Sequence, residues 1–327
     1  MPKRIITVAQ LGLSACVLAV CIAAQAQTYP AKPVRWLVPS AAGGAFDVLT
    51  RALAPQLSEQ TGQPFVVDNR GGAAGLLGME QGARAAPDGY TILTAGTSQL
   101  IFNQFFHAKI PYDPLKDYAP IALLADLPIA LWVHTSVPVK TFRELITYAK
   151  ANPNKLNYGS AGVGHLFHLA TEMLSERTGI QVVHVPYKGV GPAMQEFFAG
   201  RIQLLFVVAQ TPVMNQYRAG KVLPLVGGTD KRLPKLPEVP TFDEMGVPGM
   251  EMPNWIGVVA PAGTPREFIN RLNREMIAAT RSPAAVKTYE GMAMETVTTS
   301  PEQLAQKIER EIRTWGPFIR KLGIKPE

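Results

Sequence analysis

Three short loops rich in glycine and small polar residues are the segments of this chain best suited to chemistry. They span 39–47, with the sequence PSAAGGAFD, 96–98, with GTS, and 159–165, with GSAGVGH. Each follows an apolar run and precedes a segment typical of a helix. Glycine lets the backbone approach a ligand closely, and the free amides at a helix start attract an anion such as a carboxylate. The loops therefore predict a site for a small anion.

Enzyme signatures are incomplete in the same segments. Tyr158 stands where a nucleophile elbow needs glycine, and the GVGHLF sequence at 162–167 lacks the third glycine of a dinucleotide fingerprint. No Walker A sequence occurs. A hydrolase that uses Ser160 and His165 is a minor alternative, because no acidic residue is placed to orient the histidine. The chain is therefore not expected to be an enzyme.

Metal-binding patterns are also weak. His165 and His168 lie three residues apart, on one face of an expected helix, but no third ligand accompanies them at a recognisable spacing. Cys16 and Cys21 are the two cysteines of the chain, and both precede the expected mature N-terminus. We expect no metal and no organic cofactor, with His165 facing a cleft and His168 packed or hydrogen-bonded.

The first 26 residues have the pattern of a secretory signal. Lys3 and Arg4 form a basic start, an apolar run covers 11–24, and the AQA sequence at 24–26 fits a cleavage site. The run is shorter than the ~20 apolar residues that a membrane-spanning helix needs. Cleavage before Gln27 and export are expected. The alternative is a lipoprotein, because residues 13–16 have the look of a lipobox that ends at Cys16.

Composition sets the broad class. The chain has 327 residues, of which 47% are hydrophobic and 17% charged, so it can bury a large core and is neither disordered nor fibrous. A formal net charge of +7 raises the question of a nucleic-acid partner. Basic residues alternate with acidic ones, as in the EREIR sequence at 309–313, and no nucleic-acid-binding motif is present. We expect no nucleic-acid partner.

The elements that must position the loops alternate between strand-like and helix-like segments, which is typical of an α/β protein with parallel sheets. Capping-box sequences at 141–144, 264–267 and 300–303 mark three helix starts. Strands are expected at 34–39, 65–68, 91–95, 121–124, 130–134, 156–159, 182–185, 202–208, 222–226, 256–260 and 295–297.

About 300 mature residues exceed what a single core covers, so two lobes are expected. No linker rich in glycine or serine separates them, and apolar segments at 121–133 and 222–228 are the best candidates for crossings between lobes. Lobe 1 would then be discontinuous, with residues 27–128 and 228–327, and lobe 2 would span 129–227.

The mature chain resembles the Bug receptors, which are the extracytoplasmic solute-binding components of tripartite tricarboxylate transporters. The similarity rests on segments that follow one another in family order: YPAKPVR at 29–35, DNRGG at 68–72, APDGYT at 86–91, PYDP at 111–114, LNYGSAG at 156–162, HVPYKG at 184–189 and PAGTP at 261–265. The resemblance implies a type II periplasmic-binding-protein fold, in which two α/β lobes joined by crossing strands enclose a ligand cleft. It also implies a periplasmic location.

On this resemblance the chain is expected to be a monomer that captures a small organic acid and delivers it to membrane permease subunits. The alternative is a ligand-sensing adaptor for a membrane sensor protein. Loop amides would hold the carboxylate, Ser98 and Ser160 would donate hydroxyl hydrogens, and Phe46 and Tyr187 would close the walls. The candidate ligand-binding residues are Ser40, Ala41, Gly43, Gly44, Phe46, Asp47, Ser98, Ser160, Gly162, Val163, Gly164, His165, Tyr187 and Ala209.

Overall fold

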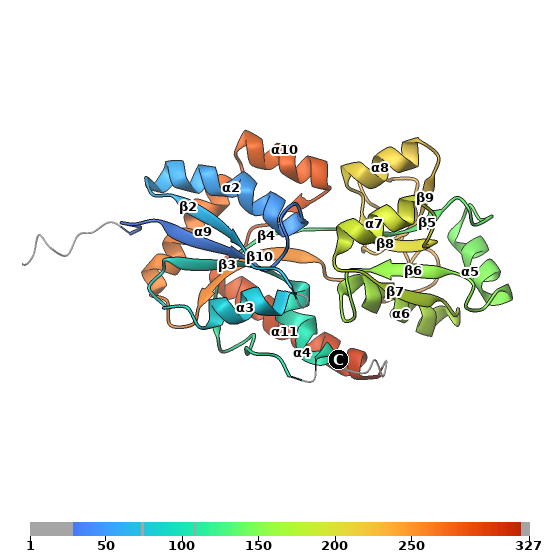
Figure 1. Ribbon diagram of the computed structural model, residues 1–327, viewed down its shortest axis with the longest axis horizontal. Helices are drawn as coiled ribbons and strands as arrows, with labels where there is room; N and C mark the ends of the chain where they lie inside the picture. Colours follow the sequence, from blue (N-terminus) through green and yellow to red (C-terminus); the bar gives the residue numbers. More distant parts are fainter. Residues whose placement is uncertain (1–28, 73–74, 108, 322–327) are drawn as a thin grey trace, which may run out of the picture.

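Two β-sheets, each covered by helices on both faces, build the molecule (Figure 1). The computed structural model describes residues 29–72, 75–107 and 109–321. The expected signal peptide and the alternative lipidation site at Cys16 lie outside the described residues. We call the six-stranded sheet with its helices lobe 1 and the five-stranded sheet with its helices lobe 2.

The sheet of lobe 1 has the strand order β11-β4-β10-β3-β1-β2. Strands β1, β2 and β3 are parallel, whereas β10 lies antiparallel between β3 and β4. The strands are β1 (Val34–Val38), β2 (Phe65–Asn69), β3 (Thr91–Gly96), β4 (Tyr118–Asp126), β10 (Trp255–Pro261) and β11 (Glu295–Thr296).

The sheet of lobe 2 has the order β7-β6-β8-β5-β9. Strands β6, β7 and β8 are parallel, and β5 lies antiparallel between β8 and β9. The strands are β5 (Ile129–His134), β6 (Asn157–Ser160), β7 (Val183–Pro186), β8 (Leu204–Val208) and β9 (Val222–Gly227). All eleven expected strands are present. The predicted lobe limits fall between strands of different sheets, and as domain boundaries they stay a prediction.

The expected α/β lobes are present, but each sheet is mixed rather than entirely parallel, and the chain path explains why. Only Leu127 and Pro128 separate β4 in lobe 1 from β5 in lobe 2. A chain that enters a lobe at its junction with the other lobe must run away from that junction. β5 and β10 are these entering strands, so each runs against the strands that end there. The carboxyl ends of β1 and β3 in lobe 1 and of β6, β7 and β8 in lobe 2 consequently face each other (Figure 1).

Helices connect the strands and cover the sheets. In lobe 1, α2, α9 and α10 lie on one face, and α3, α4 and α11 lie on the other (Figure 1). The helices are α2 (Ala45–Thr61), α3 (Leu76–Ala83), the π-helix η2 (Ser98–Phe102), α4 (Asn103–Phe106), α5 (Phe142–Ala151), α6 (Leu166–Thr178), α7 (Val190–Phe198), α8 (Thr211–Arg218), α9 (Arg266–Ala279), α10 (Pro283–Met292) and α11 (Pro301–Lys321).

Two of the three expected capping sequences form side-chain hydrogen bonds that cap the first turn of a helix. At α11, Ser300 Oγ accepts from the Gln303 amide at 3.2 Å and Gln303 Oε1 accepts from the Ser300 amide at 2.9 Å. At α5, Thr141 Oγ1 accepts from the Glu144 amide. The third expectation is wrong, because the Thr264 hydroxyl donates to the Pro261 carbonyl and α9 begins without a side-chain cap. Among the described residues, no helix is both long and apolar enough to cross a bilayer.

Candidate ligand-binding site

The expected site residues gather at the two facing edges. Ser40 to Asp47 lie between β1 and the first turn of α2, and Ser98 begins η2 directly after β3. In lobe 2, the 160–165 loop follows β6, Tyr187 follows β7 and Ala209 follows β8. Segments far apart in the sequence are therefore brought to one junction, as the expectation of a ligand site between two lobes requires.

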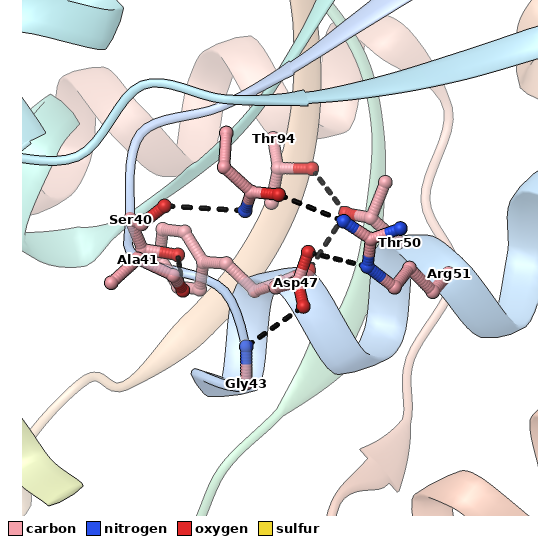
Figure 2. A network of polar contacts seen from close by, with 9 residues as sticks. Ser40, Ala41, Gly43, Asp47, Thr50, Arg51 and Thr94 are labelled. Carbon is pink, nitrogen blue, oxygen red and sulfur yellow. Dashed lines mark hydrogen bonds and ion pairs between the residues drawn. The ribbon is translucent and has the colours of Figure 1, made fainter.

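The 40–47 loop is held by a polar network centred on Asp47 (Figure 2). One carboxylate oxygen of Asp47 accepts from the Gly43 amide at 2.8 Å, and the other accepts from Arg51 Nε at 2.8 Å. Arg51 also donates to the side-chain oxygen of Asn69, whose amide group donates to the Ser40 carbonyl. Asp47 is only 3% exposed. Asp47 therefore serves to shape the loop, because both of its carboxylate oxygens already accept hydrogen bonds.

Further contacts hold this loop against β3 and against the 68–72 segment. Thr50 Oγ1 donates to the Phe46 carbonyl at 2.7 Å and therefore accepts from Thr94 Oγ1, also at 2.7 Å, which ties α2 to β3. A Cβ on Gly71 would stand 2.9 Å from the Ala41 nitrogen. Glycine at this position lets the DNRGG segment lie directly against the backbone of the loop.

The amides of Gly43 and Gly44 were expected to hold a carboxylate, and the structure assigns them other partners. The Gly43 amide donates to Asp47, and the Gly44 amide donates to the Ala41 carbonyl at 3.3 Å. Gly43 needs to be glycine because its φ is +81°, whereas Gly44 has φ −73° and caps α2 without a side chain. The first amides of α2 thus have no side-chain acceptor and can bind an anion.

In the 160–165 loop, Ser160 is an internal support. It is fully buried, its Oγ donates to the Gly162 carbonyl at 2.8 Å, and it accepts from the Gly162 amide at 3.2 Å. His184 Nε2 lies 2.7 Å from the same oxygen. Because the single hydroxyl hydrogen is used on Gly162, Ser160 does not have the hydroxyl donor that was expected for the ligand. Because Ser160 itself is fully buried, it is not an accessible nucleophile either.

Two histidines support the following turn. His168 Nδ1 accepts from the Gly164 amide at 3.1 Å, and His168 is buried and hydrogen-bonded as expected. His165 caps α6, with its Nδ1 accepting from the Phe167 amide at 3.2 Å. Burial, with a smaller contribution from the neighbouring His168, lowers the pKa of His165 to about 4. Both rings are therefore uncharged at neutral pH.

The remaining expected residues differ in exposure. Phe46 is half-buried and packs over Gly96, where an added Cβ would stand 2.6 Å from its ring. Ser98, Val163 and Tyr187 are half-buried. Ala209 is 2% exposed and borders a cavity of about 170 Å³ at the crossing between the lobes. This cavity also involves Pro128, Leu233, Pro234, Lys235, Tyr289, Glu290, Ala293, Met294 and Glu295.

The lobes also touch directly beside the 160–165 loop. Phe106, from α4 of lobe 1, is fully buried, and its ring centroid lies 6.5 Å from that of His168 in lobe 2. A Cβ on Gly164 would stand 2.5 Å from the Phe106 Cβ. On the opposite side of the junction, Thr211 of α8 donates to the Gly291 carbonyl of α10 at 2.8 Å. These contacts set the arrangement of the lobes in this structure.

Sequence inspection missed four residues that shape the two loops: Arg51, Asn69, Phe106 and His184. Arg51 lies four residues after Asp47 on the same helix, a spacing that signals an ion pair. The other three are brought to the loops by strand pairing and lobe packing, which sequence spacing does not reveal. Within the described parts of the chain, no cluster of three or more His, Cys, Asp or Glu side chains is arranged to hold a metal ion.

Comparison with known proteins agrees with this architecture. Residues 49–324 match the model of the tripartite tricarboxylate transporter family receptor. Protein BugT of Bordetella pertussis is 33% identical over 318 residues, which cover 97% of each chain. A protein of Pseudomonas sp. strain P51, described as a UPF0065 protein in the tcbD-tcbE intergenic region, is 37% identical over 89% of this chain and 86% of its own.

Two solved structures are similar over their whole length. Rpa4515 of R. palustris with adipate has a TM-score of 0.84 and 34% identity, covering 91% of this chain and 100% of its own. MatC of Rhodopseudomonas palustris with bound malate has a TM-score of 0.81 and 29% identity, covering 89% and 100%. With its two lobes and its loops at facing edges, the chain belongs to the tripartite tricarboxylate transporter receptors of the Bug family, which are periplasmic solute-binding proteins.

Proposed function

We propose that this protein is a periplasmic receptor that captures a small organic carboxylate between its lobes and delivers it to the membrane subunits of a tripartite tricarboxylate-type transporter. One observation carries the proposal: similar chains of 34% and 29% identity were solved with adipate and with malate. A signal peptide over residues 1–26 would direct export of the receptor to the periplasm. It binds its ligand without chemical turnover.

The structure refines how a carboxylate would be held. The amides of Ala41, Ala42 and Val163 have no acceptor among the described residues, and α2 begins at Ala45 without a side-chain cap. In this proposal those amides face the carboxylate oxygens, while Gly43, Gly162 and Gly164 give the loops their shape. Hydrogen bonds to an ionised acceptor are stronger than neutral ones, so a few aligned amides suffice.

A matched pair of glycine variants tests the lobe 1 half of this site. Gly43 and Gly62, at the two ends of the 43–62 segment, have φ of +81° and +73°, and a Cβ at either would meet nothing within 4 Å. Gly43→Ala and Gly62→Ala thus carry the same backbone strain, about 1–2 kcal/mol, at opposite edges of lobe 1. We expect Gly43→Ala to weaken binding at least tenfold and Gly62→Ala to leave it unchanged.

The ligand is first found by a thermal-shift screen of mono-, di- and tricarboxylates that includes adipate and malate. An acid at ~100 times its Kd adds about 2.7 kcal/mol of stability. Titration calorimetry on the best acid should show one saturable event, and chromatography should recover the acid unchanged. Deleting the gene should abolish uptake of the labelled acid by cells. A screen without any stabilising carboxylate, or equal affinities for both glycine variants, would overturn the proposal.

A further inference from the structure

A pair of stacked histidines lies directly beneath the 160–165 loop. The rings of His168, on α6, and His184, on β7, are parallel, with an interplanar angle of 3° and centroids 4.1 Å apart. The Tyr158 ring lies beside the pair, with its centroid 4.8 Å from that of His184 and 6.3 Å from that of His168. His184 reaches the loop through Ser160, and His168 reaches it through the Gly164 amide.

A backbone hydrogen bond fixes the tautomer of His168. Since His168 Nδ1 accepts from the Gly164 amide, its proton is on Nε2, which lies 4.0 Å from Glu172 Oε1. His184 Nε2 lies 2.7 Å from Ser160 Oγ, and it donates to that oxygen when the Ser160 hydrogen is on the Gly162 carbonyl. His168 is thus the Nε2–H tautomer, and each of the two rings contacts one part of the loop.

The surroundings keep the pair uncharged. Burial lowers the pKa of His168 to about 4, and burial together with His168 lowers that of His184 to about 4. The titratable groups that face the pair are His165 and Glu172 on α6 and Tyr158 on β6, while α4 contributes the apolar Phe106. The Tyr158 hydroxyl donates to Glu172 at 2.5 Å, so this carboxylate is already partnered.

We propose that His168, with His184 stacked upon it, is a positioning residue for ligand binding: its uncharged Nδ1 holds the Gly164 amide and so sets the shape of the lobe 2 ligand loop. The proposal rests on the proposed function for the role of this loop. Gly164 is buried, so loss of the acceptor would leave its amide without a partner. The loop would then rearrange to expose that amide to water.

Two replacements of His168 that match each other in shape isolate the acceptor. Asparagine places its Oδ1 near the position of the histidine Nδ1, and leucine has the shape of asparagine without any polar atom. We expect His168→Asn to keep both the loop and the ligand affinity within about threefold. We expect His168→Leu to lose the exchange protection of the Gly164 amide and at least tenfold in affinity.

His134 provides a matched control in the same lobe. Its Nδ1 also accepts a backbone amide, that of Ser136 at 3.1 Å, but β5 runs away from the junction and ends at the far edge. His134→Leu should lower stability and leave ligand affinity unchanged. A general loss of stability in lobe 2 is thereby separated from a specific effect on the loop.

The readouts are amide hydrogen exchange and the ¹⁵N spectrum of the unliganded full-length mature protein, followed by calorimetry with adipate and malate. Unchanged protection of Gly164 in His168→Leu, or equal loss in His168→Asn, would overturn the positioning role. Loss of protection in His168→Leu with unchanged affinity would overturn the ligand role of the loop. If the parent protein binds no carboxylate, the proposed function fails, while the exchange measurement still decides how the loop is held.

Discussion

Gly164 is the position where one added methyl group should lower stability and ligand affinity most. Its φ is +76°, which costs an alanine about 1–2 kcal/mol. The new Cβ would also stand 2.5 Å from Cβ and 2.8 Å from Cγ of Phe106, and these atoms are at the root of a buried ring that cannot swing away. Overpacking of this kind costs about 1–3 kcal/mol.

Because Phe106 belongs to lobe 1 and Gly164 to lobe 2, part of the cost of Gly164→Ala is relieved if the lobes move apart. We therefore expect a loss of about 2–5 kcal/mol in the free energy of unfolding or, where the lobes separate, a larger radius of gyration in solution. Ligand affinity should fall at least tenfold in either case.

A double-mutant cycle with Phe106→Ala separates strain from overlap. Phe106→Ala removes the ring and its 2.8 Å contact at Cγ but keeps the 2.5 Å contact at Cβ, so it relieves part of the overlap and none of the strain. The double variant should therefore be more stable than the two single effects predict, by about 1 kcal/mol. Gly162→Ala is the control, because Gly162 has φ +128° but the Tyr187 carbonyl, at 3.8 Å, is the nearest atom to its added Cβ. Urea titrations measure all variants. Simple additivity between Gly164→Ala and Phe106→Ala would refute the reasoning.

Three further outcomes are expected. Asp47→Asn should weaken ligand binding less than Asp47→Ala, because the asparagine oxygen can still accept from the Gly43 amide. Alanine leaves that amide without a partner, which costs about 1–3 kcal/mol. Calorimetry that ranks the affinities of the two variants in the opposite order contradicts this. The free energy of unfolding should decline as the pH falls from about 6.5 towards 4, because His168 takes up a proton in the unfolded chain but, with its pKa of about 4, not in the native state. This contribution is up to about 3 kcal/mol, and it should be missing from the pH profile of His168→Asn measured by urea titration. Chelator-treated protein should keep its affinity for the carboxylate, and a loss that a divalent ion restores would show that a metal takes part.

The local elements of the fold follow from the sequence because short-range physics determines them. Apolar runs bounded by turn residues located the strands to within about three residues, and the Ser300 capping box located the start of α11. Of the four loop glycines singled out by the sequence, Gly43, Gly162 and Gly164 have positive φ, whereas Gly44 does not. Export depends on a linear signal pattern, so the sequence alone predicts it.

Only the tertiary structure decided how these parts serve the site. The direction of β5 and β10 depends on where the chain crosses between lobes, which no local pattern encodes. The partners of the loop amides depend on how each turn folds, so the specific hydrogen bonds made by Asp47, Ser160 and His168 could not be assigned from the sequence. The sequence predicts which backbone positions can adopt a positive φ, while packing between segments decides which hydrogen-bonding groups remain free for a ligand.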